Sequence, residues 1–256
     1  MSAKDDALAD EYADRLERAG YETLDAYRDD AVLVSVGGDG TVVYNAWHYD
    51  EPTILPVAKP DSEGNTIQLD GETFLDGIRA LEEGRRGEDY RIETHAQLSA
   101  YRDDEELRGD FRALNDLNLH HRSPTHAAKF RVRVVDGDTT YVLDRAIGDG
   151  VVVATPFGAT GYYRAITGGG FEEGIGVAFN NLHKPRDALD GLVLSDRGCV
   201  EVAVHEDENA SSVLLARDND PDAHVLEPGA PVEIRRSEYR VGIVRIDALA
   251  PDWRRY

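Results

Sequence analysis

Apolar residues in the first part of the chain follow a helical period that is interrupted by one unbroken run. Apolar side chains four residues apart predict an amphipathic helix over 7–16, with Gly20 as its stop signal. The run at 31–36 (AVLVSV) is typical of a strand that is buried on both faces in a parallel sheet. Further elements are expected at 42–48 (helix), 54–57 (strand) and 74–83 (helix). This part of the chain is therefore predicted to be α/β.

Beyond about residue 92 the pattern changes to short alternating segments. Residues 129–135 alternate between apolar and polar, and Asp136-Gly137 is a hairpin signal before 139–143. Further short strands are expected at 151–154, 199–204, 212–216, 232–235 and 241–246. Turn-rich spacers separate them, as in an antiparallel sandwich. The predicted fold class is α/β plus all-β, with an N-terminal Rossmann-like α/β domain and a C-terminal antiparallel β-sandwich-type domain.

The change of pattern places a domain boundary near the charged turn at 84–87. We expect an α/β domain over 1–90, a β-rich domain over 91–245 and a tail over 246–256 that completes the first domain. Residues 50–70 contain three prolines and little periodicity, so most of this segment is expected to be loop.

Net charge is the strongest feature of the composition. The 256 residues include 50 acidic and 28 basic side chains, which gives a formal charge of −22. This charge repels nucleic-acid phosphates and anionic lipids, so neither is expected as a partner. Either the protein is an ordinary acidic one, or its surface is adapted to molar salt, which screens self-repulsion. Such a composition resembles that of halophilic archaeal proteins and predicts a loss of stability in low salt.

The chain carries no signal for a membrane or for secretion. No apolar run reaches the length of a membrane helix, and the N-terminus lacks the layout of a signal peptide. The single cysteine, Cys199, excludes an intramolecular disulfide and a multi-cysteine metal site, and we interpret it as a small core residue. A soluble, cytoplasmic protein is expected.

The strongest local motif is Gly37-Gly38-Asp39-Gly40-Thr41, directly after the buried run. Glycines at the carboxyl end of a strand let the backbone turn sharply, and the N-terminus of the next helix suits a phosphate. Asp39 would repel that phosphate unless it accepts a proton from an attacking hydroxyl or helps to hold Mg²⁺. The alternative is a tight turn capped by an aspartate.

Two further segments carry groups suited to a nucleotide. Residues 149–162 (DGVVVATPFGATGY) run from a strand into a glycine-rich loop, where Thr160 and Tyr162 supply a polar and a stacking group. Earlier in the chain, Asn115 stands beside Asp116. A ribose diol is matched by such a pair, because adjacent hydroxyls need both donors and acceptors.

In this order, the three segments resemble the NAD kinase family, which combines a GGDGT loop, an Asn-Glu pair and a later DG…TPTGSTAY segment. The resemblance runs from about residue 30 to the C-terminus. It implies transfer of a phosphoryl group from ATP, or polyphosphate, to the 2′-hydroxyl of the adenosine ribose of NAD. Mg²⁺ would be bound through the substrate phosphates. Family members form dimers or tetramers, so a homodimer or homotetramer that binds NAD and ATP is implied.

Roles for individual residues also follow from the resemblance. Asp39 is expected to orient or deprotonate the 2′-hydroxyl. The phosphate-binding loop is expected to consist of Gly37, Gly38, Gly40 and Thr41. NAD binding is implied for Asn115, Asp116, Asp149, Thr160, Gly161, Tyr162 and Asp218. No side chain is expected to ligate a metal directly.

Several positions depart from the family pattern. Asp116 is one methylene shorter than the usual glutamate, and Phe157, Ala159 and Gly161 replace Thr, Ser and Ala. The first strand, which usually precedes the first helix, is not found. These departures keep open a non-catalytic NAD(P)-binding homologue. A lipid kinase that shares the GGDGT loop fits less well, because it leaves 149–162 unexplained.

A few other residues are weaker candidates. His120, His121 and His126 lie close in sequence, but adjacent strand residues point to opposite faces, so no shared metal is expected. Arg164 is either a phosphate contact or a solvated side chain. Lys59, one of four lysines, follows the expected strand at 54–57 and is a candidate for mutation.

Overall fold

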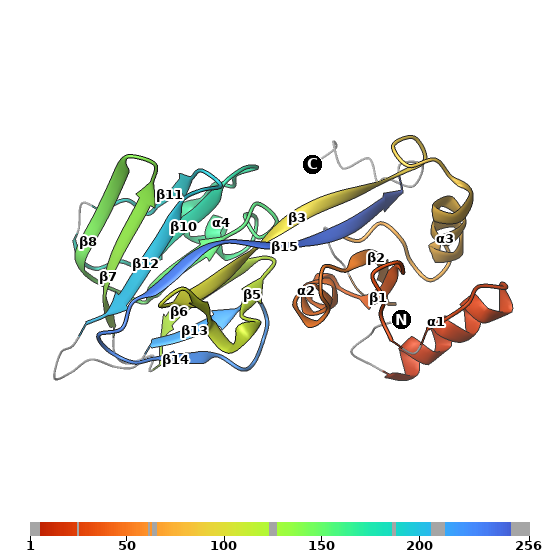
Figure 1. The fold of residues 1–256 in the computed structure, drawn as a ribbon, viewed down its shortest axis with the longest axis horizontal. Coiled ribbons are helices and arrows are strands. Elements are labelled where there is room, and N and C mark those ends of the chain that lie inside the picture. Colours follow the sequence, from red (N-terminus) through yellow and green to blue (C-terminus); the bar gives the residue numbers. More distant parts are fainter. Residues whose placement is uncertain are drawn as a thin grey trace. The chain divides into compact units, whose positions relative to one another are not determined.

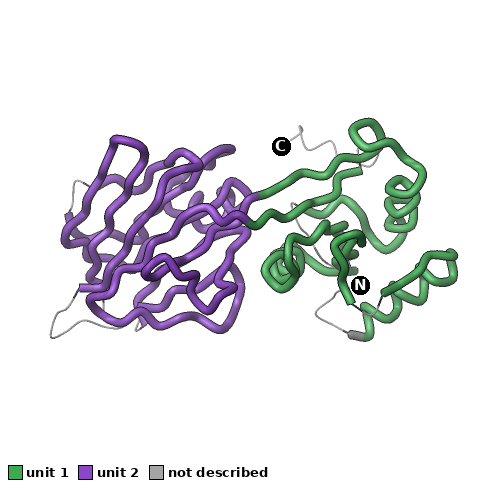
Figure 2. Tube along the Cα trace, viewed as in Figure 1, with its two compact units in different colours: residues 1–95, 239–256 green, residues 96–238 purple. Residues whose placement is uncertain are grey.

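The computed structural model describes residues 6–24, 26–60, 62, 66–122, 127–185, 188–205 and 213–246. Contacts divide the chain into two compact units, 1–95 with 239–256 and 96–238 (Figure 2). Strands β3 (Tyr90–Arg102) and β15 (Val232–Ile246) each contribute one part to either unit. The boundaries expected from the sequence, after residues 90 and 245, fall inside these two strands.

The first unit contains a small parallel sheet with three helices (Figure 1). Its elements are α1 (Asp6–Arg18), β1 (Leu33–Gly37), α2 (Asp39–His48), β2 (Thr53–Ala58) and α3 (Phe74–Glu83). β1 pairs in parallel with β2, and β2 pairs in parallel with β15 at residues 242 and 243. All five elements were predicted, although α2 begins at Asp39 rather than at residue 42.

Burial explains why this unit folds as it does. Every residue of β1 is buried, as an apolar run covered on both faces should be. One cluster joins the helices to the sheet, and it includes Tyr12 of α1, Phe74 of α3, Val36 of β1 and Val244 of β15. The four-residue spacing in α1 places Tyr12 and Leu16 in this core. The core therefore fixes the carboxyl end of β1, where the GGDGT loop begins.

The second unit consists of two antiparallel sheets. In the first, the first part of β15 pairs with β12 (Cys199–Val204), which continues to β7 (Ala128–Asp136) and β8 (Thr139–Gly148). The second has the order β11-β10-β9-β6-β13-β14. Its strands are β6 (Asp116–His121), β9 (Gly150–Ala154), β10 (Ile175–Asn180), β11 (Gly191–Leu194), β13 (Val213–Arg217) and β14 (His224–Leu226). The remaining elements are β4 (Glu105–Glu106), η1 (Leu107–Gly109), β5 (Arg112–Ala113) and α4 (Tyr162–Thr167).

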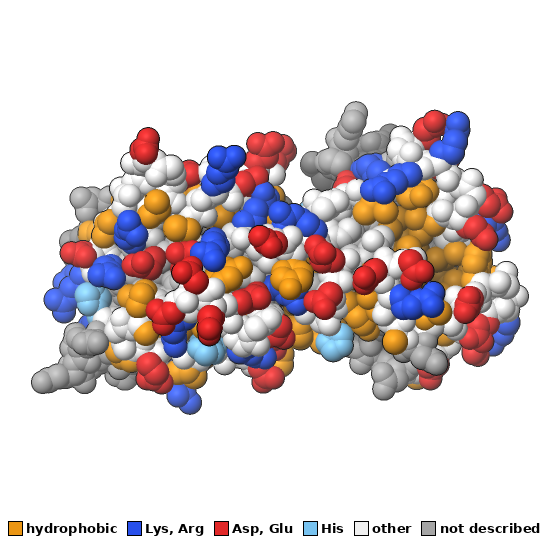
Figure 3. Space-filling view, in the orientation of Figure 1, with side chains coloured by type: hydrophobic (Ala, Val, Ile, Leu, Met, Phe, Trp, Pro, Cys, Tyr) orange, Lys and Arg blue, Asp and Glu red, His pale blue; other side chains and the backbone are white. Residues whose placement is uncertain are grey.

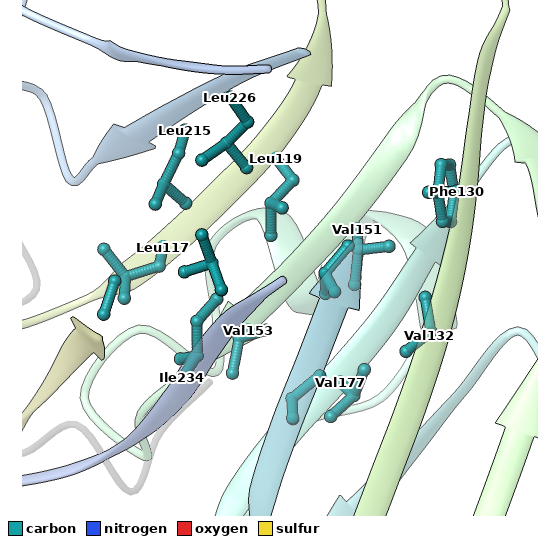
Figure 4. Packing of buried hydrophobic residues seen from close by; sticks show 14 of the residues in the cluster. Leu117, Leu119, Phe130, Val132, Val151, Val153, Val177, Leu215, Leu226 and Ile234 are labelled. Atoms are coloured by element: carbon teal, nitrogen blue, oxygen red, sulfur yellow. The ribbon is translucent and has the colours of Figure 1, made fainter. Parts of the chain in front are cut away.

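Alternation of side chains builds the core of this unit (Figure 4). Along β9, Val151 and Val153 belong to the main cluster, together with Leu117 of β6 and Ile234 of β15. Val152, on the opposite face of β9, packs with Tyr163 of α4. This period of two leaves one face of β9 for the core and one for α4.

The structure confirms the predicted α/β plus all-β class and corrects one detail of it. Segments 232–235 and 241–246 were expected as separate strands, whereas β15 is continuous from Val232 to Ile246. β15 pairs with β12 in its first part and with β2 in its second, and it also pairs with β3. A strand with these partners remains extended through its polar residues. Position 212, the expected start of β13, lies outside the described residues, as do positions 247–256 of the expected tail. No helix among the described residues is long and apolar enough to cross a membrane.

Candidate functional site

The GGDGT loop joins the end of β1 to the start of α2. Gly37 ends the strand, Gly38 is the residue that caps the helix, and Asp39 is the first helical residue. Because the cap residue is Gly38, Asp39 does not occupy the cap position of this helix. A Cβ on Gly37 would lie 2.2 Å from Thr41 Oγ1. Glycine is therefore required for the close approach of the strand end to the helix.

The Asp39 carboxylate is oriented by a segment that follows β2. The Thr66 N–H donates a hydrogen bond to Asp39 Oδ1 at 3.1 Å. Sequence reasoning missed Thr66, because it interpreted this segment as loop and no local pattern marks a backbone N–H as a donor. Lys59, directly after β2, donates its N–H to the Gly37 carbonyl at 3.3 Å. The parallel pairing of β1 and β2 brings their carboxyl ends to one edge of the sheet, which is the edge where open α/β sheets bind ligands.

In the second unit, the Asp218 carboxylate organises the turn before β6. Asp218 Oδ2 accepts the Leu114 N–H at 2.8 Å, and Oδ1 accepts the Asn115 and Asp116 N–H groups at 2.7 and 3.1 Å. The Asp218 N–H in turn donates to the Asp116 carbonyl at 2.9 Å. Asp218 adopts a φ of +46°, which Asp tolerates better than most residues. The structure thus brings Asp218 to Asn115 and Asp116, which precede it by 103 and 102 positions in the sequence.

The glycine-rich loop after β9 packs on the same turn. The Thr155 N–H donates to the Asn115 carbonyl at 2.9 Å, and the Thr155 hydroxyl donates to the Leu114 carbonyl. The Gly158 N–H donates to Thr155 Oγ1 at 3.2 Å. A Cβ on Gly158 would lie 2.3 Å from the Asn115 carbonyl oxygen. The backbone of the loop is therefore in direct contact with the backbone of the Asn115 turn, which leaves no room for a side chain.

We expect Gly158→Ala to lower the free energy of unfolding by about 1–3 kcal/mol, because the added methyl forces two backbone segments apart. Thermal unfolding would measure this loss. The matched control is Gly169→Ala, whose Cβ would meet nothing within 4 Å and whose φ is not positive. Equal melting temperatures for the two variants would contradict the close approach at Gly158.

Asp116 is a buried carboxylate beside another one. Its side chain has no hydrogen-bond donor among the described residues, and the residue is only 5% exposed. Burial, together with the neighbouring Asp218 charge, raises the pKa of Asp116 to about 7. Burial also raises the pKa of Asp218 to about 7, against the opposing effect of its three backbone donors. Because those donors favour a charged Asp218, we assign the proton of the pair to Asp116.

Such a raised pKa makes stability depend on pH. Between about pH 4 and 7 the unfolded chain has lost this proton while the folded chain keeps it, so the free energy of unfolding falls as pH rises. Asp116→Asn removes the titration and should raise the melting temperature at pH 8 by about 2–6 °C, with little change near pH 4.5. The control is Asp103→Asn, which removes the same charge at an exposed turn. A shift that is equal at both pH values would contradict the assignment.

Asp149 lies at the other end of the same strand pair. Asp116 is opposite Ala154 in the β6–β9 register, and His120 is opposite Gly150. At about 3.4 Å per residue, Asp149 is about 15–20 Å from the Asn115–Asp116 turn. Asp149 Oδ2 accepts a hydrogen bond from Asn181 Nδ2 at 3.1 Å, and its Oδ1 is 3.6 Å from His121 Nε2.

The remaining predicted residues of the loop are exposed. Thr160, Gly161 and Tyr162 lie at the surface, where Tyr162 begins α4 and is 61% exposed. Arg164 lies in α4 and is exposed as well.

The adjacent histidines of β6 differ from expectation. Although neighbouring strand residues were expected on opposite faces, the His120 and His121 ring centroids are 4.1 Å apart at the end of β6. Within the described ranges, no three His, Cys, Asp or Glu side chains are arranged to hold a metal ion. His126 lies outside the described residues.

Sequence comparison finds relatives that are named NAD kinases. No protein-family model matches the chain. The chain is 28% identical over 243 residues to "NAD kinase 2" of Gloeobacter violaceus, which covers 91% of this chain and 71% of that protein. It is 27% identical over 229 residues to the NAD kinase of Methanosarcina acetivorans, covering 87% of this chain and 77% of the relative.

Solved structures with the same fold support this similarity. An NAD kinase from Archaeoglobus fulgidus in complex with ATP matches with a TM-score of 0.67 and 20% identity, covering 96% of this chain and 93% of that one. Yeast NADH kinase complexed with NADH matches with a TM-score of 0.68 and 19% identity, covering 83% of this chain and 62% of that one. At these identities the structures show the fold alone.

Proposed function

We infer that this chain belongs to the NAD kinase family and is a phosphotransferase that makes NADP from NAD. The observation that carries this conclusion is the position of Asp39. It is the first residue of a helix that follows a buried parallel strand, and a backbone N–H orients its carboxylate. The similarity to NAD kinases across about nine-tenths of the chain supports the same assignment.

Asp39 is the residue that we assign to the chemical step. Its carboxylate orients the 2′-hydroxyl of the adenosine ribose and accepts the hydroxyl proton as the oxygen attacks the γ-phosphorus of ATP. The bond from the γ-phosphorus to the bridging oxygen breaks, and ADP leaves. We assign the ribose hydroxyl to this carboxylate, whose Oδ1 also accepts the Thr66 N–H.

The glycine loop supplies positioning for the donor phosphates. Gly37, Gly38, Gly40 and Thr41 place backbone at the start of α2, where the helix dipole favours negative charge. Mg²⁺, bound through the substrate phosphates, would neutralise charge on the donor oxygens. The Asp39 carboxylate near this loop would attract a hard cation such as Mg²⁺ to the donor phosphates without ligating it. Polyphosphate is the alternative donor.

We assign NAD binding to two places in the second unit. Asn115 and Asp116 offer a donor and an acceptor to a ribose diol, on a turn that Asp218 holds. Exposed Tyr162 offers a ring for stacking on a base, next to Thr160 and Gly161. Asp149, at the far end of β9, is within reach of an extended dinucleotide and not of a mononucleotide.

Three further properties belong to this proposal. We propose that the protein acts in the cytoplasm, as a homodimer or homotetramer. We also propose that its surface is adapted to molar salt. The charge of −22 supports this adaptation, as does the spread of acidic side chains over the visible face of both units (Figure 3). At such salt the repulsion between these side chains is screened.

A labelled-donor experiment tests the acceptor. The protein would be incubated in 2–3 M KCl with ATP carrying a radioactive γ-phosphate, Mg²⁺, NAD and diacylglycerol vesicles. We expect the label in NADP and not in lipid. Label in the lipid would favour a lipid kinase with the same loop. Binding of NAD without any labelled product would favour a non-catalytic homologue, which the replacement of two hydroxyl residues by Phe157 and Ala159 suggests.

A further inference from the structure

Arg245, near the end of β15, is a largely buried cation in the first unit. Its side chain is 14% exposed, and its Nε donates to Glu93 Oε2 on β3 at 2.7 Å. Although burial disfavours the charged form of Glu93, hydrogen bonds and charge from Arg245 and Arg91 lower its pKa below the ordinary value. Arg245 and Glu93 therefore form an ion pair, as a buried guanidinium requires.

The same guanidinium also holds the backbone of the segment after β2. Arg245 Nη1 donates to the Thr66 carbonyl oxygen. Next to it, the Ile246 N–H donates to Gln68 Oε1 at 3.0 Å. On the other side, the Ala58 N–H of β2 donates to the Leu69 carbonyl at 2.7 Å. Residues 66–69 are thus fixed between β2 and the end of β15.

Thr66 connects this arrangement to Asp39. The residue is buried, its carbonyl accepts from Arg245, and its N–H donates to Asp39 Oδ1 at 3.1 Å. Asp39 is the first residue of α2. One of the contacts that orient its carboxylate therefore comes from a residue that Arg245 holds in place.

We propose that Arg245, paired with Glu93, is a positioning residue that acts on Asp39 through Thr66. This rests on the proposed function of Asp39. A general base must keep its oxygen within about 0.5 Å of the productive position, and small displacements cost about a hundredfold in rate. Loss of Arg245 releases the Thr66 carbonyl and lets the carboxylate rotate. Because neither Arg245 nor Thr66 is assigned a contact with NAD, the substitution is expected to lower kcat and to leave KM unchanged.

Steady-state kinetics of NADP formation test the proposal. Arg245→Met is expected to lower kcat about 10- to 100-fold and to leave KM for NAD within about threefold. The kcat of Arg245→Lys should lie between those of the wild type and Arg245→Met. A lysine ammonium keeps the charge but lacks the guanidinium fork that contacts both Glu93 and Thr66. The control is Arg79→Met, which breaks an exposed ion pair with Asp76 in the same unit. A loss of kcat no larger than that of the control would overturn the proposal.

A double variant separates positioning from general destabilisation. If Arg245 acts through Asp39, then adding Arg245→Met to Asp39→Asn should cause no further loss of kcat. Losses that multiply would mean that Arg245 acts elsewhere, and the proposal would be wrong.

Hydrogen exchange provides a readout without substrate. The Thr66 amide should exchange at least tenfold faster in Arg245→Met than in the wild type, and at the wild-type rate in Arg79→Met. An unchanged Thr66 amide in Arg245→Met overturns the proposed coupling. A wild-type protein that makes no NADP would instead refute the proposed function, and the exchange result would still decide whether Arg245 holds Thr66.

Discussion

Asp39→Asn is expected to lower kcat for NADP formation by about 10²–10⁴, the range typical of the loss of a general base. Asparagine has the same size, and its side-chain oxygen still accepts the Thr66 N–H that now reaches Oδ1. It cannot take the proton of the 2′-hydroxyl. Because NAD binding is assigned mainly to the second unit, the affinity for NAD should change less than threefold.

The measurement combines turnover with NAD binding by titration calorimetry. Asp76→Asn is the matched control, since Asp76 is an exposed carboxylate on α3 of the same unit. The control should retain the wild-type kcat. Wild-type turnover in Asp39→Asn would remove this residue from the mechanism.

The second large effect is expected at Asp218. Asp218→Ala leaves three backbone N–H groups without their acceptor, and each such loss costs about 1–3 kcal/mol. The groups share one turn, so we expect a total loss of about 3–5 kcal/mol in the free energy of unfolding. Asp218→Asn should lose less, because its carbonyl oxygen still accepts the Asn115 and Asp116 N–H groups. Denaturant unfolding would measure all three proteins.

A matched variant measures how much of this loss in the free energy of unfolding comes from placing alanine at a positive φ. Asp103 has a φ of +52° at an exposed turn, close to the +46° of Asp218. Asp103→Ala therefore reports the cost of alanine at positive φ alone, about 1–2 kcal/mol. If Asp218→Ala costs no more than Asp103→Ala, the three hydrogen bonds do not hold the Asn115–Asp116 turn.

Much of the first unit could be predicted because its signals are local. A continuous apolar run identified β1, and the glycines after it identified the loop. The period of α1 was also sufficient, because apolar side chains every fourth residue face one core. These patterns arise because buried positions are apolar, and the spacing of apolar residues can be seen within a short segment of sequence.

The parts that could not be predicted depend on contacts distant in sequence. Continuity of β15 through its polar middle comes from the strands that pair with it, β12, β2 and β3, which are distant in sequence. Thr66 acts through its backbone N–H and carbonyl groups. Because other residues carry the same groups, no sequence pattern marks this position. Asp218 was linked to NAD through a family motif, whereas its carboxylate accepts hydrogen bonds from residues 114–116. Its contact with NAD stays a prediction, as do the roles assigned to the other site residues.

The central claim is that this chain phosphorylates NAD at the 2′-hydroxyl. The most direct test is to incubate the purified protein with NAD, ATP and Mg²⁺ in 2–3 M KCl and to separate the products by chromatography. We predict that NADP and ADP form in equal amounts with the wild type and that Asp39→Asn forms at least a hundredfold less. A folded wild-type protein that binds NAD and forms no NADP would contradict the claim.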